Sequence, residues 1–228
     1  MRHHSFSDGT MLARKLAADV AWSLARRIET HGAASLVVSG GRTPEAFLRE
    51  LARAPLDWTR VHVTLADERC VPPDSAASNL RLVRDAFAGT PAARARLLEI
   101  DATHDDAAAA WSAALSALPR PFAAVVLGMG NDGHFASLFP GMPGLAAALA
   151  AAGPAATVVH GTAPVEPAAR LSLTLATLLD TDLLALHVTG SSKLATLQQA
   201  SCPGSALDMP VRALLEQRSV TLEIYHAP

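Results

Sequence analysis

The sequence predicts an α/β fold with one mostly parallel sheet and helices on both of its faces. Short apolar runs typical of buried strands occur at 35–38, 61–65, 122–127 and 183–188. Segments with helical periodicity separate these runs, and such alternation is typical of parallel sheets. Because 228 residues suffice for one large domain and are few for two, we expect residues 1–228 to form a single domain.

The first half of the chain starts with a predicted helix over 10–30, where apolar residues from Leu12 to Ile28 share one stripe. After the strand at 35–38, Thr43-Pro44-Glu45 predicts a helix that Thr43 caps and Pro44 opens. The strand at 61–65 ends at Asp67-Glu68-Arg69. Each strand in this half is therefore followed by polar residues.

In the second half, periodicity predicts helices over 79–87 and 107–118, and a further helix that starts at Gly190. A short strand is expected near 157–160. The run 220–225 alternates between apolar and polar residues, which predicts a final strand at the edge of the sheet.

Composition and charge exclude several classes of protein. The chain has 19 Lys and Arg against 21 Asp and Glu, a net charge of −2, which argues against a nucleic-acid or membrane surface. No apolar run reaches the length of a membrane span, and the N-terminus lacks the apolar core of a signal peptide. With only Cys70 and Cys202 present, we expect a cytoplasmic protein with reduced thiols.

The most informative stretch runs from Gly128 to Pro140 and follows the strand at 122–127. Its glycines allow a sharp turn and a close approach of the backbone to a ligand. Within the turn lie Asp132 and His134, an acid and a base two residues apart. Open α/β sheets place their sites at the carboxyl ends of strands, so we expect this pair to be catalytic.

The spacing of Gly128, Gly130 and Gly133 also matches the dinucleotide-binding pattern G-x-G-x-x-G. That pattern needs a helix that opens at the third glycine and an acidic residue about 20 positions later. Pro140 and Gly141 stop any such helix, and an alanine run occupies the region near 150. We therefore reject a nicotinamide or flavin site.

Four loops that follow the predicted strands carry the remaining chemistry, and in a parallel sheet they meet along one edge. The Gly40-Gly41-Arg42-Thr43 loop leads into a helix N-terminus, which is a ready anion site, although a plain turn with a cap explains it equally well. The segment from Gly190 to Lys193 repeats this arrangement and adds a positive charge. Two such loops at one edge favour a bound phosphate.

Two arginines have alternative interpretations. Arg69, beside Asp67 and Glu68, can form a local salt bridge or can hold a phosphate or a developing oxyanion with its guanidinium. Arg170 can bind a ligand in the same way, or it can be a surface charge beside an apolar run. His62 and His187 lie within predicted strands and are expected to be structural.

Several catalytic classes lack their motifs. The sequence has no H-E-x-x-H metal motif, no P-loop and no G-x-S-x-G elbow. Neither a second thiol near Cys70 in the sequence nor a histidine signature beside it supports catalysis by Cys70. A histidine and an aspartate beside an anion site remain, which suits proton transfer or the activation of water.

The motifs Ser39–Pro44, Asp67–Pro72, Ser78-Asn79, Gly128–Pro140 and Gly190–Lys193 resemble those of 6-phosphogluconolactonases, in the same order. The resemblance implies a Rossmann-like three-layer α/β/α sandwich shared with sugar-phosphate isomerases and deaminases. It also implies a cytosolic enzyme that hydrolyses 6-phospho-D-glucono-1,5-lactone, in the second step of the oxidative pentose phosphate pathway. By the same resemblance we expect no metal or organic cofactor, and the sequence leaves the oligomeric state open, a monomer included.

By the same resemblance, His134 is the general base, and Asp132 orients it or favours its charged form. Arg69, Lys193 and the loop of Gly40, Gly41, Arg42 and Thr43 would hold the phosphate, Asp67 belongs to the substrate site, and Arg170 would meet hydroxyls or the carboxylate product. The residue after the histidine is commonly threonine in the family and is Phe135 here, so one hydroxyl beside the base is missing.

Two rival functions remain. Glucosamine-6-phosphate deaminases or isomerases resemble this chain at the first glycine loop and at Asp67-Glu68, but their histidine segment is followed by Asn-Glu-Pro where this chain has Leu138-Phe139-Pro140. The acid that ring opening needs is therefore missing. A sugar-phosphate-binding regulator without activity is the other rival, and the intact Asp132 and His134 argue against it.

Overall fold

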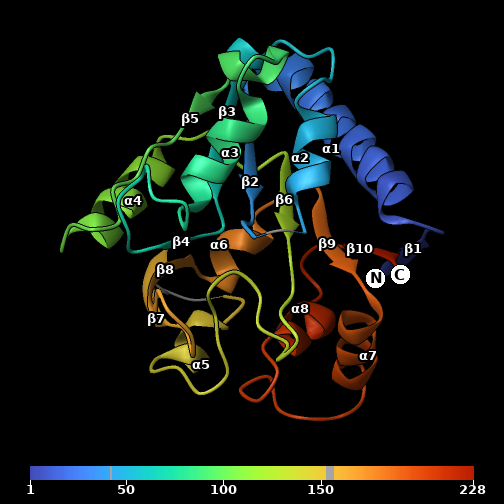
Figure 1. Ribbon diagram of the computed structural model, residues 1–228, viewed down its shortest axis with the longest axis vertical. Helices are drawn as coiled ribbons and strands as arrows, with labels where there is room; N and C mark the ends of the chain where they lie inside the picture. The colour runs from blue at the N-terminus through green and yellow to red at the C-terminus, as the bar shows by residue number, and fades with distance from the viewer. Residues whose placement is uncertain (42, 153–156) are drawn as a thin grey trace.

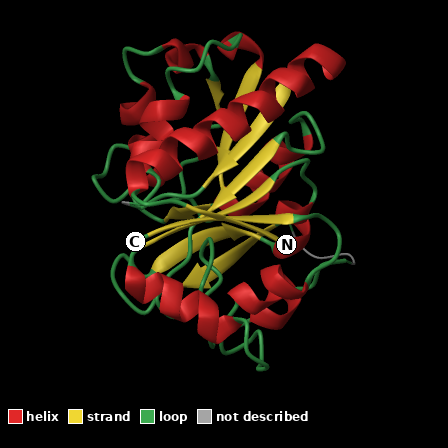
Figure 2. Ribbon diagram, turned by 90° about the vertical axis from the view of Figure 1, so that its right-hand side faces the viewer, coloured by secondary structure: helices red, strands yellow, loops and turns green. Residues whose placement is uncertain are grey.

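A seven-stranded sheet forms the centre of the computed structural model, which describes residues 1–41, 43–152 and 157–228 (Figure 1). All pairs of neighbouring strands in this sheet are parallel. Helices lie on both sides of the sheet (Figure 2), so the predicted three-layer α/β/α fold is confirmed. The strands follow one another across the sheet in the order β1 (Arg2–Ser5), β10 (Leu222–Ala227), β9 (Leu184–Thr189), β6 (Ala124–Leu127), β2 (Ala34–Val38), β3 (Val61–Leu65) and β5 (Arg96–Leu97).

Local sequence signals explain the first helix, α1 (Gly9–His31). The carboxylate of Asp8 accepts hydrogen bonds from the N–H groups of Thr10 and Met11, which caps the N-terminus of the helix. Gly32 ends it in the left-handed conformation, with φ of 82°. α1 packs against α2 (Glu45–Leu51), which in turn packs against α3 (Asn79–Phe87).

The other helices connect the later strands. They are α4 (Ala107–Ser116), α5 (Leu145–Ala148), α6 (Leu175–Leu179), α7 (Ser191–Ala200) and α8 (Val211–Glu216), with two short 3₁₀ turns at Trp58–Arg60 and Pro91–Arg94. The helix predicted from Gly190 is α7, and Gly190 is its N-cap. The helix predicted from Thr43 is α2, but its N-cap is Pro44 and no side chain caps it, so the predicted capping role of Thr43 is wrong.

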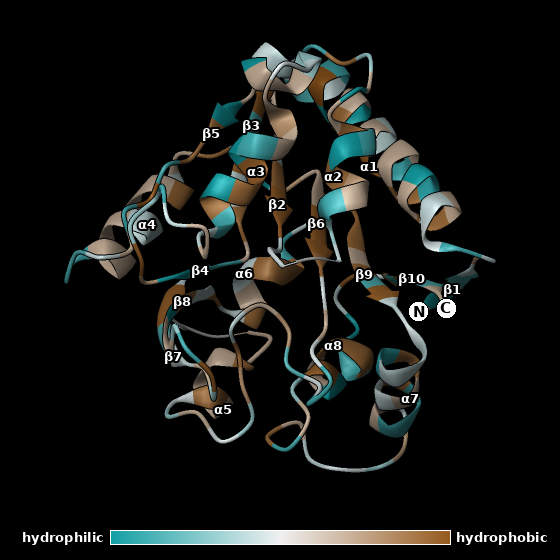
Figure 3. Cartoon of the chain, viewed as in Figure 1, coloured by the Kyte–Doolittle hydropathy of each residue, from teal (hydrophilic) through white to brown (hydrophobic). Residues whose placement is uncertain are grey.

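The core of the molecule lies between the central strands and the helices. Every residue of β2 and of β6 is buried, as expected for strands covered on both faces. Figure 3 shows these strands as hydrophobic along their length. Their apolar side chains therefore make continuous runs in the sequence, which is why these strands could be predicted.

A second sheet of three antiparallel strands was not expected. It consists of β4 (Asp67–Arg69), β8 (Ala169–Leu173) and β7 (Val158–Thr162), in that order. The strand expected near 157–160 is β7, and it belongs to this second sheet. Asp67–Arg69 therefore form a strand of their own directly after β3, and this strand pairs with a segment about one hundred residues later in the sequence.

The prediction that the final strand lies at an edge is wrong. β10 lies between β9 and β1, because the N-terminal residues Arg2–Ser5 add one more parallel strand beyond it. The sequence Arg-His-His-Ser has no apolar alternation, and for this reason it gave no signal of a strand.

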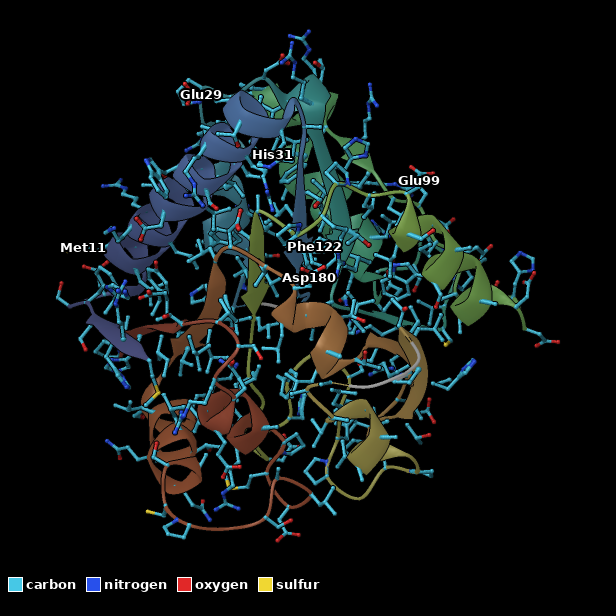
Figure 4. All side chains as sticks on the ribbon, turned by 180° about the vertical axis from the view of Figure 1, so that it is seen from behind. Met11, Glu29, His31, Glu99, Phe122 and Asp180 are labelled. Atoms are coloured by element: carbon cyan, nitrogen blue, oxygen red, sulfur yellow. The ribbon has the colours of Figure 1, made fainter. Side chains whose placement is uncertain are left out.

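The order of the strands places the four predicted loops side by side. β9, β6, β2 and β3 are consecutive in the sheet, and the loops that carry the candidate residues follow these four strands. Before the amino-terminal ends of β6 and β9, the Phe122 N–H donates to the Asp180 carbonyl over 2.8 Å. This bond joins the segments that precede the two strands, and Figure 4 labels both residues. β2 has β3 on one side and β6 on the other, so the order in which the chain adds strands to the sheet reverses at β2. Ligand sites of open α/β sheets lie at such a switch point.

Candidate active site

A cavity of about 350 Å³ opens at this switch point. Each of the four loops contributes to its wall, so the predicted convergence of the loops is confirmed. The lining residues are Ser39, Gly40, Gly41, Thr43, Pro44, Asp67, Arg69, Asn79, Gly128, Met129, Gly130, His134, Ala136 and Lys193.

His134 lies in the cavity wall and is held by its own turn. Its Nδ1 is 2.5 Å from Oδ1 of Asp132, and its backbone N–H donates to the same oxygen over 3.1 Å. The ring of Phe139 packs against the imidazole at 4.3 Å between centroids. Asp132 does not line the cavity, so it contacts His134 from behind.

Two opposing effects act on the pKa of Asp132. Burial alone would raise this pKa, but the hydrogen bond from the His134 ring and the charge that this ring can carry lower it, and the net result is a pKa below the ordinary value. Asp132 is therefore ionised at neutral pH and acts as an acceptor for Nδ1–H. This fixes the tautomer in which Nε2 of His134 is the nitrogen that can take a proton.

Gly130 is required for this arrangement. A Cβ at position 130 would lie 2.2 Å from two atoms of the His134 ring and 2.6 Å from Asp132 Oδ1, distances that no side chain can occupy. The next residues also take an unusual path, because Ala136 has φ of 48°, in the left-handed region. This path brings the Ser137 hydroxyl within 2.6 Å of Asp67 Oδ2, to which it donates a hydrogen bond.

The donors on the opposite wall come from two loops. Lys193, in the first turn of α7, donates from Nζ to the Thr43 hydroxyl over 3.2 Å. Gly40 and Gly41 lie beside Thr43 in the same wall. The positive φ of Gly41, 92°, turns the backbone here. Arg42, predicted to belong to this group, lies outside the described residues.

Arg69 lines the cavity, and its guanidinium donates to the Ala77 carbonyl. The alternative interpretation, a local salt bridge between Arg69 and Asp67 or Glu68, is wrong. The Glu68 carboxylate accepts the backbone N–H of Arg69 over 2.7 Å instead, and within the described part of the chain Arg69 has no carboxylate partner within 4 Å. Its positive charge is therefore available to the cavity.

Arg170 is buried, with 6% of its surface exposed, so its interpretation as a surface charge is wrong. It pairs in register with Arg69 across β4 and β8, but it does not line the cavity. Burial and the neighbouring charge of Arg69 lower the pKa of Arg170, while Asp67 opposes this effect. Arg170 thus lies behind Arg69, where its charge adds to the positive potential of the site.

Two buried polar residues of the wall, Ser39 and Asn79, were not predicted as site residues. Ser39 directly follows the strand β2, and Asn79 begins α3 after the N-cap Ser78. Their signal in the sequence was weak, because serine and asparagine are common at turns and at helix ends.

The described ranges contain no cluster of three or more His, Cys, Asp or Glu side chains arranged to hold a metal ion. In the same ranges, no helix has both the length and the apolar character needed to cross a bilayer.

Comparisons with known proteins show the family to which the chain belongs. The model of the family described as glucosamine-6-phosphate isomerases/6-phosphogluconolactonase matches residues 7–222. A 6-phosphogluconolactonase of Rhizobium meliloti (strain 1021) is 44% identical over 99% of this chain and 98% of its own length, and one of Pseudomonas putida is 43% identical over 99% and 92%. The crystal structure of a 6-phosphogluconolactonase from Shewanella baltica OS155 superposes with a TM-score of 0.94 at 36% identity, covering 100% of this chain and 98% of that one. The chain therefore belongs to the glucosamine-6-phosphate isomerase/6-phosphogluconolactonase family.

Proposed function

We propose that the chain is a cytoplasmic 6-phosphogluconolactonase that hydrolyses 6-phospho-D-glucono-1,5-lactone to 6-phospho-D-gluconate, without a metal or organic cofactor. The observation that carries the proposal is His134, which lies in the cavity wall with Nδ1 on Asp132 and Nε2 left to accept a proton. The two curated relatives named above, at 44% and 43% identity, carry this activity in their names. The reaction belongs to the second step of the oxidative pentose phosphate pathway.

The chemistry follows from these positions. Nε2 of His134 takes a proton from water while the water oxygen bonds to C1 of the lactone, which gives a tetrahedral oxyanion. Collapse of this intermediate breaks the bond between C1 and the ring oxygen, and the ring oxygen receives the proton from His134. A positioned base typically accelerates such a step by about 10²–10⁴-fold.

The phosphate is held at a distance from the reacting carbon. Lys193, Arg69 and the wall of Gly40, Gly41 and Thr43 supply the donors for a dianion, and Arg170 adds positive potential behind Arg69. Binding of the phosphate fixes the position of C1 relative to His134, so part of the entropic cost of the reaction is met by the binding step. A net-negative protein can bind a dianion in this way because the positive groups are concentrated in one cavity.

Phe139 disfavours the deaminase alternative. The aromatic ring of Phe139 covers one face of the His134 imidazole at the position where, by resemblance, the deaminases have a glutamate. An apolar ring cannot donate or accept the proton that ring opening requires. The pair of His134 and Phe139 is therefore suited to hydrolysis and not to loss of an amine.

The test is hydrolysis of freshly generated 6-phosphogluconolactone, corrected for its spontaneous opening, by the wild type and by His134→Ala. We expect kcat to fall by at least about 100-fold in the variant, while binding of 6-phosphogluconate changes by less than about threefold. Ammonia release from glucosamine-6-phosphate, measured in parallel, is expected to be absent. An equal loss of binding and of turnover in His134→Ala would assign His134 a structural role.

A further inference from the structure

The carboxamide of Asn79 uses its nitrogen in a hydrogen bond, but its oxygen has no partner among the described residues. Its Nδ2 donates to the Asp67 carbonyl over 2.8 Å, and its backbone N–H donates to Glu68 Oε1 over 2.8 Å. These two bonds set the direction of the side chain, which is 1% exposed. Oδ1 is buried in the cavity wall and has no hydrogen-bond partner among the described residues.

Ser39 shows the same deficit on the neighbouring loop. It is 6% exposed, it lines the cavity, and its hydroxyl has no partner in the part of the chain that the structure describes. The two residues flank Gly40, where a Cβ would lie 1.8 Å from Asn79 Oδ1. Only glycine at position 40 leaves this oxygen its place in the wall.

Unpaired buried polar atoms are rare in folded proteins, and each one costs about 1–3 kcal/mol. Two of them on residues that line one cavity therefore indicate a ligand group that completes their hydrogen bonds. The chemistry of Asn79 Oδ1 restricts that group, because a carboxamide oxygen only accepts. A phosphate oxygen, the lactone carbonyl and the product carboxylate cannot satisfy it, whereas a hydroxyl can.

The lining of the cavity accordingly offers two kinds of group. Lys193 and Arg69 are donors suited to the phosphate. Asn79 Oδ1 is an acceptor, and the Asp67 carboxylate, which the Ser137 hydroxyl holds in place, is a second acceptor in the same lining. A phosphorylated polyol presents both kinds of group.

We propose that Asn79, assisted by Ser39, is a specificity-determining residue that accepts a hydrogen bond from one ring hydroxyl of the sugar lactone. The inference rests on the proposed function, since it assumes a phosphorylated sugar lactone in this cavity. A site that is built to bind a hydroxyl discriminates strongly against an analogue without it, because the buried polar atoms of the site are then left unpaired.

The experiment compares the parent lactone with its 2-deoxy, 3-deoxy and 4-deoxy analogues, for the wild type and for Asn79→Leu. In the wild type, kcat/KM is expected to fall by at least about tenfold for one of the three analogues. In Asn79→Leu, loss of the same hydroxyl is expected to change kcat/KM by less than about threefold. Such a result means that the substitution and the missing hydroxyl remove the same hydrogen bond. If Asn79 were only structural, the variant would still discriminate against the deoxy analogue.

Ser39, directly after β2, and Ser35, within β2, provide a matched pair in case Asn79→Leu does not fold. Ser39→Ala removes a hydroxyl without a described partner and is expected to fold normally while its discrimination at that hydroxyl falls by at least about threefold. Ser35→Ala removes a hydroxyl that donates to the Pro119 carbonyl, far from the cavity, and is expected to lower stability without changing discrimination.

The possible failures are distinct. Equal use of all four lactones by the wild type, or an undiminished preference in both Asn79→Leu and Ser39→Ala, overturns the inference and leaves the proposed hydrolysis intact. Absence of any enzymatic hydrolysis of the parent lactone overturns the proposed function itself.

Discussion

At the scale of single residues, the position of His134 depends on the absence of a side chain at Gly130 in the same turn. The imidazole lies against Gly130, where there is no Cβ, and Asp132 holds its Nδ1. Phe139 closes one face of the ring. The orientation of the proposed base is thus set by three residues within ten positions of the sequence, which makes it sensitive to a change of one methyl group.

This sensitivity gives a prediction for Gly130→Ala. The new Cβ lies within 2.6 Å of both His134 and Asp132, so the pair must separate, and we expect kcat for lactone hydrolysis to fall by at least about 100-fold. Gly128→Ala is the control for the geometry of the pair and not for kcat, because a Cβ there meets no described atom within 4 Å but Gly128 also lines the cavity. An NMR signal of the Nδ1 proton of His134 that is lost in the first variant and kept in the second checks the cause. Unchanged kcat in Gly130→Ala contradicts the explanation.

The sequence was sufficient to predict several residues of the cavity wall. His134, Asp67, Arg69, Thr43 and Lys193 lie on the segments after β6, β3, β2 and β9, and all of them line the cavity. Asp132 and Arg170 proved to lie one layer behind it. Ser39 and Asn79 could not be predicted, because what distinguishes them is a missing hydrogen-bond partner, and this is visible only when the fold has closed around them.

At the scale of elements, the buried carboxylate of Glu68 connects β4 to α3. Oε1 accepts the N–H groups of Arg69 (2.7 Å) and Asn79 (2.8 Å), and Oε2 accepts the N–H of Leu80 (2.8 Å) and the hydroxyl of Ser78 (2.9 Å). The first N–H groups of a helix have no partner within it, and here one acidic side chain satisfies two of them. Glu68 thereby fixes the backbones of Arg69 and Asn79, two residues of the cavity wall, relative to each other.

We therefore predict that Glu68→Gln lowers the free energy of unfolding by about 3 kcal/mol, because an amide nitrogen replaces an acceptor among buried donors. Glu99→Gln is the control. Its carboxylate pairs with Arg84 at 2.8 Å on the surface and is labelled in Figure 4, and its loss is expected to cost less than about 1 kcal/mol. Urea denaturation of both variants measures the difference. Equal costs would show that the Glu68 network adds no more than a surface pair.

Elements were predictable where one strand or helix carries its own pattern. The strands of the large sheet are apolar runs, and the helices show their period. The second sheet was not predictable, since β4 has the sequence Asp-Glu-Arg and becomes a strand only by pairing with β8. The edge position of β10 was predicted wrongly for a similar reason, because the polar strand β1 is defined by its partner and not by its own residues.

At the scale of the whole molecule, the order β9, β6, β2 and β3 in the sheet explains how loops up to 150 residues apart in the sequence form one cavity, as the bond from Lys193 to Thr43 shows. That the four loops meet was predictable from the alternation of strands and helices. The presence of β1 and of the second sheet was not predictable. The single domain stays a prediction.

The same packing gives the whole molecule a dependence on pH through His187. This residue lies in β9, is 2% exposed, and has an Nδ1 without a partner among the described residues. Burial, and to a smaller extent the charge of Lys193, lower its pKa from the ordinary value of 6.5 to about 4. The folded protein therefore keeps His187 neutral at pH values where the unfolded chain is already protonated.

The sign of the effect follows from this difference. Below pH 6.5 the unfolded state binds a proton that the folded state does not bind, so stability is lost as the pH falls toward about 4, by about 3 kcal/mol in total. In His187→Leu this contribution is absent. We expect the free energies of unfolding of the wild type and the variant, measured in urea at pH 7.5 and near pH 4.5, to diverge, with the variant gaining relative to the wild type at the lower pH. A constant difference between the two proteins across this range would contradict a buried, neutral His187.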